Sequence, residues 1–249
     1  MTAHQRLLGF ANETAYPYIL NLPIYINHAD DVSVLLVGSV ATGLCIESSD
    51  VDICLLCKEA VFDEIAKGTN WKNGRPTEIE INNTQLHYYA ISYENLEQKI
   101  ADFDDVVFYV YGNAIALNDN AGLFEKIKNL IFNEEIKSQR KSKSVDMLIR
   151  RNRALKQIFD KEHDPILRIT IGLELIELLL KTVALFDDVP FDKRKRFYST
   201  ALTGNLGANL HHKIDCLIAS LSEIVREENK EQASVFLQIV DECIASFND

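Results

Sequence analysis

Two short segments in the first half of the chain combine residue types that could do phosphate and metal chemistry. Gly38 and Ser39 follow an apolar run, and Asp50-Val51-Asp52 comes shortly after them. A glycine at the end of a strand lets the backbone approach a ligand closely, and a serine offers its hydroxyl and amide to phosphate oxygens. Side chains two residues apart on a strand point the same way, so we expect both carboxylates on one face.

Paired carboxylates repel and raise each other's pKa unless a cation lies between them. Magnesium takes oxygen ligands and keeps positions open for substrate phosphates, and two ions about 3.5–4 Å apart could stabilise both oxygens of an in-line displacement. We expect a third carboxylate from a neighbouring strand, TEIEI at 77–81, where Glu78 and Glu80 share one face. The sequence therefore predicts a site for magnesium, with two ions.

Strands are needed to position these groups. Apolar, β-rich runs predict strands over 33–38, 51–57 and 86–92, and strict alternation predicts another over 77–81. Asn82-Asn83 predicts a tight turn, because asparagine tolerates positive φ. On the strand over 51–57, Val51 and Ile53 would point into the core, opposite to the carboxylates.

Helical patterns occupy most of the remaining chain. They cover 4–20, 59–67, 93–102, 121–132, 134–160, 165–186, 190–203 and 209–247. Strands in the first half and helices in the second predict an α+β fold, with a mixed sheet and flanking helices followed by an all-α helical bundle. We place the domain boundary between 134 and 135, giving domains 1–134 and 135–249.

Composition narrows the classes of function. The net charge of −11 disfavours general nucleic-acid binding and would suit a cationic acceptor. No segment reaches the ~18 consecutive apolar residues of a membrane span, and the first residues lack the pattern of a secretory signal. We therefore expect a cytoplasmic protein with no membrane partner. Five cysteines are an odd number, which favours reduced thiols, and the lone Cys54-x-x-Cys57 lacks the second pair of a structural zinc site.

The joined pattern, GS followed by SDVDI with an acidic strand downstream, resembles the polymerase-β-like nucleotidyltransferase superfamily. The signature of that superfamily is hG[GS], followed after about a dozen residues by a D-h-[DE] pair on a strand. Within it, the sequence looks closest to antibiotic nucleotidyltransferases of the kanamycin type. The similarity runs from VGSVATG through SDVDICLLC and EIEIN to ALNDNAGLFEKI, which is roughly residues 33–132.

This resemblance implies a catalytic nucleotidyltransferase domain over 1–134 and a helical substrate-binding domain over 135–249. The implied reaction is magnesium-dependent transfer of a nucleoside monophosphate, AMP from ATP, onto a hydroxyl of a small polar acceptor such as an aminoglycoside-like compound. Pyrophosphate would be released, and antibiotic resistance would be the biological role. The expected partners are a nucleoside triphosphate and a small-molecule acceptor, not nucleic acid, and a homodimer is left open.

The resemblance also implies roles for individual residues. Gly38, Ser39 and Ser49 would contact the triphosphate. Asp50, Asp52 and Glu80 would hold the metal and act in catalysis. Glu80 is preferred over Glu78 because EIEIN matches the family's strand with its second glutamate as the ligand.

In kanamycin-type relatives, the helical domain supplies a general base and a lysine that contacts the triphosphate. Glu177 and Lys181 are the candidates here, because their i,i+4 spacing puts both on one helix face, near Glu174. The alternative is an ion pair at the edge of a core helix, since burying an unpaired charge is costly. Glu80 or Glu78 is then the alternative base.

Other polar or aromatic groups have two interpretations each. A basic cluster could contact phosphates or an RNA, or be a solvated helix face. Lys193 to Arg196 could contact the triphosphate or dock a partner, and four tyrosines could line an acceptor pocket or be sheet residues. His211-His212 is expected in a turn before a helix. The basic cluster is Lys137, Arg140, Lys141, Lys143, Arg150, Arg151 and Arg153, and the tyrosines are Tyr88, Tyr89, Tyr109 and Tyr111.

Two other functions remain open. One is nucleotidylation of a protein or tRNA in a toxin–antitoxin pair, although such antitoxin relatives are usually shorter. The other is a regulator that binds nucleotide without catalysis.

Overall fold

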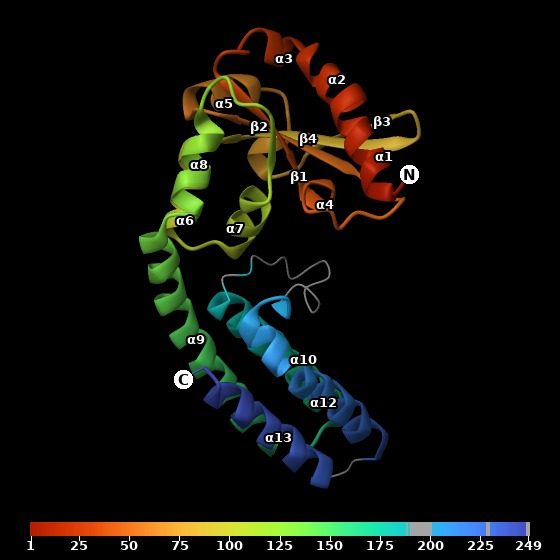
Figure 1. Cartoon of the computed structure of the whole chain (residues 1–249), viewed down its shortest axis with the longest axis vertical. Helices are drawn as coiled ribbons and strands as arrows, with labels where there is room; N and C mark the ends of the chain where they lie inside the picture. Colours follow the sequence, from red (N-terminus) through yellow and green to blue (C-terminus); the bar gives the residue numbers. More distant parts are fainter. Residues whose placement is uncertain (188, 190–200, 228–229, 248–249) are drawn as a thin grey trace. The chain divides into compact units, whose positions relative to one another are not determined.

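The computed structural model describes residues 1–187, 189, 201–227 and 230–247 (Figure 1). The chain divides into two compact units, Met1–Ile136 and Lys137–Asp249. The first unit contains all the described strands, and the second consists of helices. The predicted α+β fold, with a mixed sheet followed by a helical region, is confirmed.

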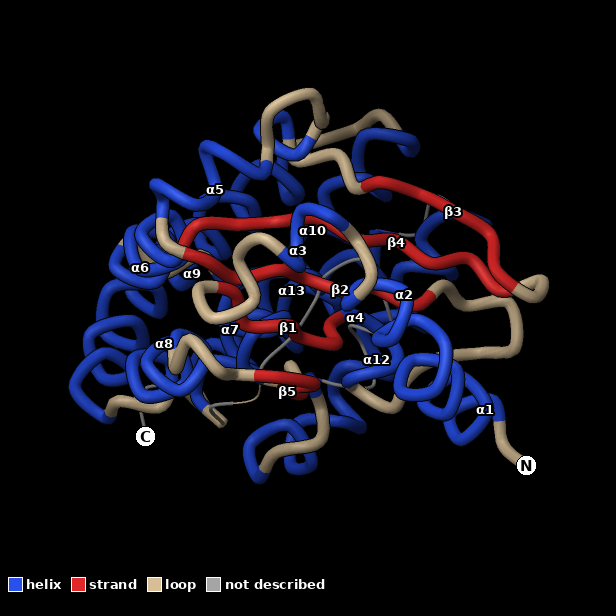
Figure 2. The backbone as a smooth tube through the Cα atoms, turned by 90° about the horizontal axis from the view of Figure 1, so that it is seen from above, coloured by secondary structure: helices blue, strands red, loops and turns tan. Residues whose placement is uncertain are grey.

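A five-stranded sheet forms the centre of the first unit, in the order β3-β4-β2-β1-β5 (Figure 2). Strands β2 and β4 run parallel, and the other neighbouring pairs are antiparallel. The strands are β1 (Val32–Val37), β2 (Val51–Cys57), β3 (Thr77–Ile81), β4 (Thr84–Ser92) and β5 (Ile115–Asn118).

Each face of the sheet has its own apolar core. Ile53 and Leu55 of β2 belong to one core, together with residues of the N-terminal helices. Cys54 and Leu56 belong to the opposite core, with residues of α6 (Tyr93–Ala101), α7 (Asp105–Gly112) and α8 (Leu123–Ile131). Because both faces are covered, β1 and β2 are apolar along most of their length rather than alternating.

The N-terminal helical region predicted over 4–20 is broken into consecutive pieces. They are α1 (Ala3–Phe10), a π-helical turn (Ala11–Ala15), α2 (Tyr16–Leu20) and, after Asn21 and Leu22, α3 (Pro23–Ile26). The side chain of Thr2 accepts a hydrogen bond from the backbone of Gln5 and so caps α1. Shorter helical elements, α4 (Gly38–Ala41), α5 (Glu59–Ile65) and a 3-10 turn (Trp71–Asn73), connect the strands.

The second unit packs long helices around a core of its own. They are α9 (Glu134–Lys161), α10 (Pro165–Phe186), α12 (Asn205–Glu227) and α13 (Lys230–Ala245). Phe159 and Phe236 stack at 4.8 Å between ring centroids in this core. The carboxylate of Asp164 caps the first turn of α10, where Pro165 follows. Within the described residues, no helix is both long and apolar enough to cross a membrane.

Several local predictions are corrected by the structure. The helix predicted over 209–247 is two helices, and His211-His212 lies inside α12 rather than in a turn before a helix. Helix α7 and strand β5 were not predicted, because short elements carry little periodic signal. Tyr109 and Tyr111 therefore belong to a helix and not to the sheet. The prediction of a helix over 190–203, with Lys193 to Arg196, falls largely outside the described residues.

Candidate active site

The end of β1 explains why a glycine is found at position 38. Gly38 has φ of +71°, and a Cβ built on it would lie 2.2 Å from Oδ2 of Asp52. The register places Val37 opposite Asp52, so the chain turns directly beside that carboxylate. Any other residue would suffer backbone strain and would displace Asp52.

Ser39 follows in the short helix α4 and is only 6% exposed. Its backbone oxygen accepts hydrogen bonds from Leu44 N at 3.0 Å and Thr42 Oγ1 at 3.1 Å. Its buried Oγ has no hydrogen-bond partner within the described chain. Because leaving a buried polar group unsatisfied costs about 1–3 kcal/mol, this hydroxyl is an unused hydrogen-bonding group next to Gly38.

The two aspartates meet a histidine from the neighbouring strand. Asp50 directly precedes β2, and Asp52 lies on it in register with His87 of β4. His87 Nδ1 lies 3.0 Å from Asp50 Oδ2 and 3.6 Å from Asp52 Oδ1. Val51 and Ile53 are fully buried in the core of the opposite face, as the alternation predicts.

This arrangement has the donor groups of a metal site. One ligand atom from each of Asp50, Asp52 and His87 lies within 4.8 Å of the other two. The three side chains are 30%, 24% and 21% exposed, so a ligand can reach them from solvent. Carboxylate oxygens suit magnesium and manganese, and an imidazole nitrogen also suits later transition metals. The residues therefore fit a divalent cation.

The predicted neighbouring strand for the third carboxylate is corrected. Strand β4 lies between β2 and β3, so TEIEI is not adjacent to the aspartates. The turn at Asn82 and Asn83, with φ of 50° and 59°, folds β4 back along β3. The longer and more buried β4 then pairs with β2, while the charged β3 forms the edge of the sheet.

Both glutamates of β3 are exposed and lie outside the cluster of Asp50, Asp52 and His87. Glu78 is paired in register with His87, and Glu80 with Gln85, whose Nε2 donates a hydrogen bond to Glu80 Oε2 at 3.1 Å. Glu80 as a metal ligand stays a prediction. His87 was missed because the strand order decides which side chain faces the aspartates, and that order is a long-range property.

A family model described as a nucleotidyltransferase domain matches residues 26–152. This match includes the glycine–serine turn, the aspartates and His87. The chain belongs to this nucleotidyltransferase family. The predicted superfamily and the predicted class of enzyme are thereby confirmed, whereas the kanamycin-type likeness stays a prediction.

Among solved structures, a nucleotidyltransferase-like protein from Exiguobacterium sibiricum 255-15 has a similar fold. The TM-score is 0.50 at 12% sequence identity, and the match covers 96% of this chain and 75% of that chain. At this identity, the likeness supports the fold alone. No protein of the curated set matches the chain.

Ser49 of the nucleotidyltransferase closes the turn that leads to the aspartates. Its hydroxyl accepts a hydrogen bond from Ile46 N at 2.9 Å, and its own N–H donates to Ile46 O at 3.0 Å. The hydroxyl can still donate a hydrogen bond to another group. Contact between Ser49 and a triphosphate stays a prediction.

Glu177 and Lys181 form the i,i+4 ion pair expected on α10, with 3.5 Å between Nζ and Oε1. Both side chains are partly exposed. The neighbouring Glu174 pairs instead with Arg151 of α9. The ion pair agrees with either interpretation, so the general base and the triphosphate lysine stay predictions.

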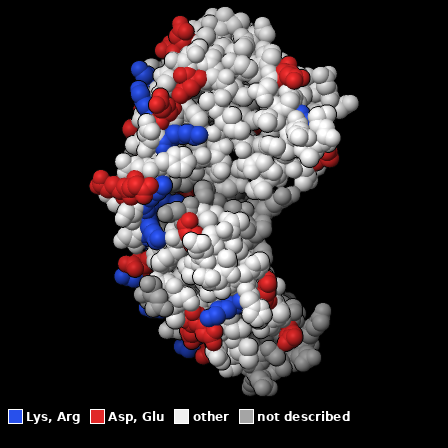
Figure 3. Space-filling view, viewed as in Figure 1, with Lys and Arg blue, Asp and Glu red and all other residues white. Residues whose placement is uncertain are grey.

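Some side chains of the basic cluster on α9 form contacts within the second unit. Lys141 donates a hydrogen bond to Phe186 O at 2.8 Å at the end of α10, and Arg151 pairs with Glu174. Acidic and basic side chains alternate along the side where α9 lies (Figure 3). This mixing, together with the burial of Arg140, disfavours a single phosphate-binding patch.

Further along the same face of the sheet, the side chains next to the aspartates are buried and uncharged. Tyr111 Oη lies 3.3 Å from Tyr89 Oη and 3.6 Å from Cys54 Sγ. Burial raises the pKa of Cys54 and of Cys57 to about 12. These two cysteines belong to cores on opposite faces, and all five cysteines in the described structure are free thiols. A role for the CxxC pair as joint metal ligands is not supported.

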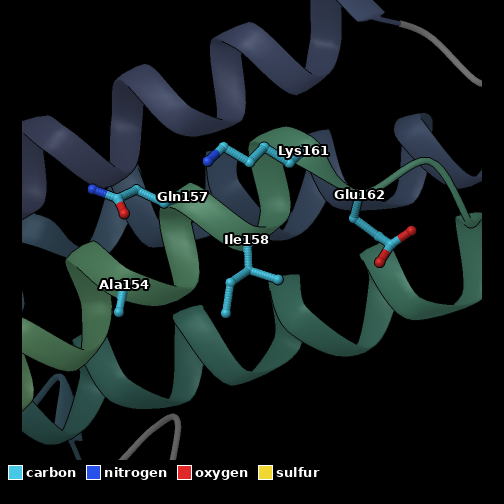
Figure 4. A pocket seen from close by; sticks show the side chains of 5 residues that line it. All are labelled: Ala154, Gln157, Ile158, Lys161 and Glu162. Carbon is cyan, nitrogen blue, oxygen red and sulfur yellow. The ribbon is translucent and has the colours of Figure 1, made fainter.

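A groove of about 380 Å³ lies on α9 of the second unit (Figure 4). It is lined by Ala154, Gln157, Ile158, Lys161 and Glu162. Two of its five side chains are charged and of opposite sign, and none belongs to the candidate active site.

Proposed function

We propose that this nucleotidyltransferase transfers AMP from ATP to a hydroxyl of a small polar acceptor and releases pyrophosphate. The observation that carries the proposal is the convergence of Asp50, Asp52 and His87 beside the turn at Gly38 and Ser39. Membership of the nucleotidyltransferase family supports the reaction class. The kanamycin-type pattern supports an aminoglycoside-like acceptor and a role in antibiotic resistance.

Asp50 and Asp52 would hold the divalent cation with their carboxylates. When bound, the cation supplies charge neutralisation for the triphosphate and for the leaving pyrophosphate. Gly38 keeps Asp52 in place by leaving room for its carboxylate. The unused hydroxyl of Ser39 and the backbone amides around Gly38 would hold phosphate oxygens, with Ser49 as a further donor.

The acceptor hydroxyl attacks the α-phosphorus of ATP and must lose its proton. A carboxylate close to that hydroxyl is the group suited to accept the proton. We assign this role to Glu177, with Lys181 as a contact to the triphosphate, and Glu80 or Glu78 as the alternative base. The P–O bond to pyrophosphate breaks as the new P–O bond to the acceptor forms.

The test is a transfer screen with α-labelled ATP, with and without divalent cations, using aminoglycosides, purified proteins and RNAs as acceptors. We expect label on a small compound and an equal amount of pyrophosphate. Asp50→Asn and Asp52→Asn should each lose at least about 100-fold of this activity. Asp63→Asn is the matched control, because Asp63 is an exposed aspartate paired with Lys72 outside the site.

Each outcome has a distinct meaning. Wild-type turnover by both aspartate variants would refute the site. Label on protein or RNA instead of small compounds would support a macromolecular acceptor, and ATP binding without pyrophosphate release would support a regulator.

A further inference from the structure

The third polar group of the cation site is an imidazole. His87 is the β4 residue in register with Asp52, and its Nδ1 contacts both aspartates, at 3.0 Å and 3.6 Å. In the described part of the chain, no carboxylate joins these two aspartates in a cluster of this kind. The site thus offers two carboxylates and one nitrogen ligand.

Other histidines of the chain provide a comparison. His28 lies 3.9 Å from Glu64 Oε1, and His211 lies 3.8 Å from Asp215 Oδ2, so both distances are longer than the 3.0 Å between His87 and Asp50. His87 instead brings one nitrogen close to two carboxylates on the solvent-accessible end of the sheet. A surface ion pair needs one partner, whereas convergence of three donor atoms is what a metal ion requires.

The choice of ligand has a consequence for the choice of metal. A neutral imidazole gives the three groups a formal charge of −2, where a third carboxylate would give −3. Magnesium depends on charge and oxygen ligands, whereas first-row transition metals gain from a nitrogen ligand. We propose that His87 is a cation ligand through Nδ1, and that this nitrogen ligand shifts the preference of the site from Mg²⁺ toward first-row transition ions, for which paramagnetic Mn²⁺ is the probe.

Strand β3 carries a carboxylate, Glu78, that is placed to orient the second ring nitrogen of His87. Glu78 is directly opposite His87 in the β3–β4 register. Directly opposed residues of an antiparallel pair have side chains on the same face, about 4.5–5.5 Å apart at Cβ. A carboxylate at this place is suited to orient a metal-bound histidine, since such histidines usually donate their second N–H. Glu78 would then be a positioning residue.

The inference rests on the proposed function only in using the same cation site, and it can be tested without turnover. Pulsed electron paramagnetic resonance of the full-length protein with Mn²⁺ detects nitrogen bound directly to the ion. We expect a ¹⁴N coupling that changes to a ¹⁵N coupling when the histidines are ¹⁵N-labelled. Bound Mn²⁺ without nitrogen coupling would overturn the proposal, because His87 would then lie outside the coordination shell.

Variants connect the signal to His87. His87→Asn should abolish the coupling, and His87→Asp should reduce the ratio of Mn²⁺ to Mg²⁺ affinity at least about tenfold, the lower end of what loss of a metal-site partner costs. His28→Asn is the matched control and should keep both properties. An unchanged ratio in His87→Asp, or a coupling that survives His87→Asn, would contradict the assignment.

The same measurements separate this proposal from the proposed reaction. If Mn²⁺ binds with the nitrogen coupling but no transfer occurs, the reaction is wrong and the ligand assignment stands. If transfer occurs with Mg²⁺ and no nitrogen coupling is seen, the reaction stands and the role of His87 is wrong. If Mn²⁺ does not bind in the absence or presence of ATP, the ligand assignment is overturned.

Discussion

At the scale of single residues, two glycines with nearly the same φ allow the effect of backbone strain to be separated from the effect of a collision with Asp52. Gly38 and Gly43 have φ of +71° and +72°, but an added Cβ meets Asp52 only at Gly38 and meets nothing within 4 Å at Gly43. Position 38 therefore requires glycine for two reasons: the backbone has a positive φ, and a side chain there would collide with the carboxylate of Asp52.

Both Gly38→Ala and Gly43→Ala should lose about 1–2 kcal/mol of stability from the left-handed backbone. Gly38→Ala alone should also lose Mn²⁺ binding and transfer activity, because Asp52 must move. Denaturant unfolding and metal titration of both variants measure these effects. Equal metal affinity in the two variants would show that the contact with Asp52 has no functional role.

The serine hydroxyls permit a similar comparison. Ser39 and Ser33 are both buried, but within the residues that the structure describes only Ser33 has a partner for its Oγ, which donates to Asp119 Oδ1 at 2.5 Å. Ser39→Ala should therefore leave stability unchanged within about 1 kcal/mol, whereas Ser33→Ala should lose about 1–3 kcal/mol. Thermal unfolding measures this, and ATP titration should show weaker binding only for Ser39→Ala.

The buried thiols predict how stability depends on alkaline pH. In the unfolded chain Cys54 and Cys57 ionise near the ordinary pKa of 9.0, but burial raises the pKa of each to about 12 in the folded protein. The folded state thus holds protons that the unfolded state loses, so stability is full below pH 9 and falls as pH rises toward 12. Urea unfolding at increasing pH should show this fall, and Cys54→Ala should reduce it.

At the scale of elements, the turn between β3 and β4 decides which side chain meets the aspartates. Asn82 and Asn83 both have positive φ, the backbone of a two-residue hairpin turn. Asn83→Gly should stabilise the protein by up to about 1 kcal/mol because the hairpin turn favours glycine here, and Asn83→Val should destabilise it by about 1–2 kcal/mol. Chemical unfolding is the measurement, and equal stability of the two variants would contradict this account of the turn.

Local patterns predicted the strands of this hairpin well, but not its place in the sheet. Strand β3 was predicted at 77–81, as observed, and β4 at 86–92, within the observed Thr84–Ser92, because apolar runs and alternation are local signals. The position of β4 beside β2 depends on contacts between segments far apart in sequence. The sequence therefore pointed to Asp50, Asp52 and Gly38, which the structure brings together, but not to His87, which the strand order places beside the aspartates.

At the scale of the whole molecule, the two units have separate cores and separate candidate roles. The cation site is built entirely within the first unit, whereas Glu177 and Lys181 belong to the second. A test of their proposed roles must therefore distinguish binding of the cation from transfer of the nucleotide.

Glu177→Gln should lower transfer at least about 100-fold, the lower limit usual for a general base, and leave Mn²⁺ affinity unchanged. Glu174→Gln is the control, because Glu174 lies on the same helix and pairs with Arg151. Single-turnover kinetics with saturating ATP gives the comparison. Equal rates in the two variants would assign Glu177 to a structural ion pair.

The single parallel pair in the sheet has a thermodynamic consequence. Asp52 and His87 become neighbours only when the crossover that contains α5 and β3 is complete, so an unfolded chain does not offer the three donor groups together. An ion that binds here recognises the native state alone, and a 100-fold excess over its dissociation constant should add about 2.7 kcal/mol to the free energy of unfolding. Cation-dependent melting would then report assembly of the β2–β4 ladder.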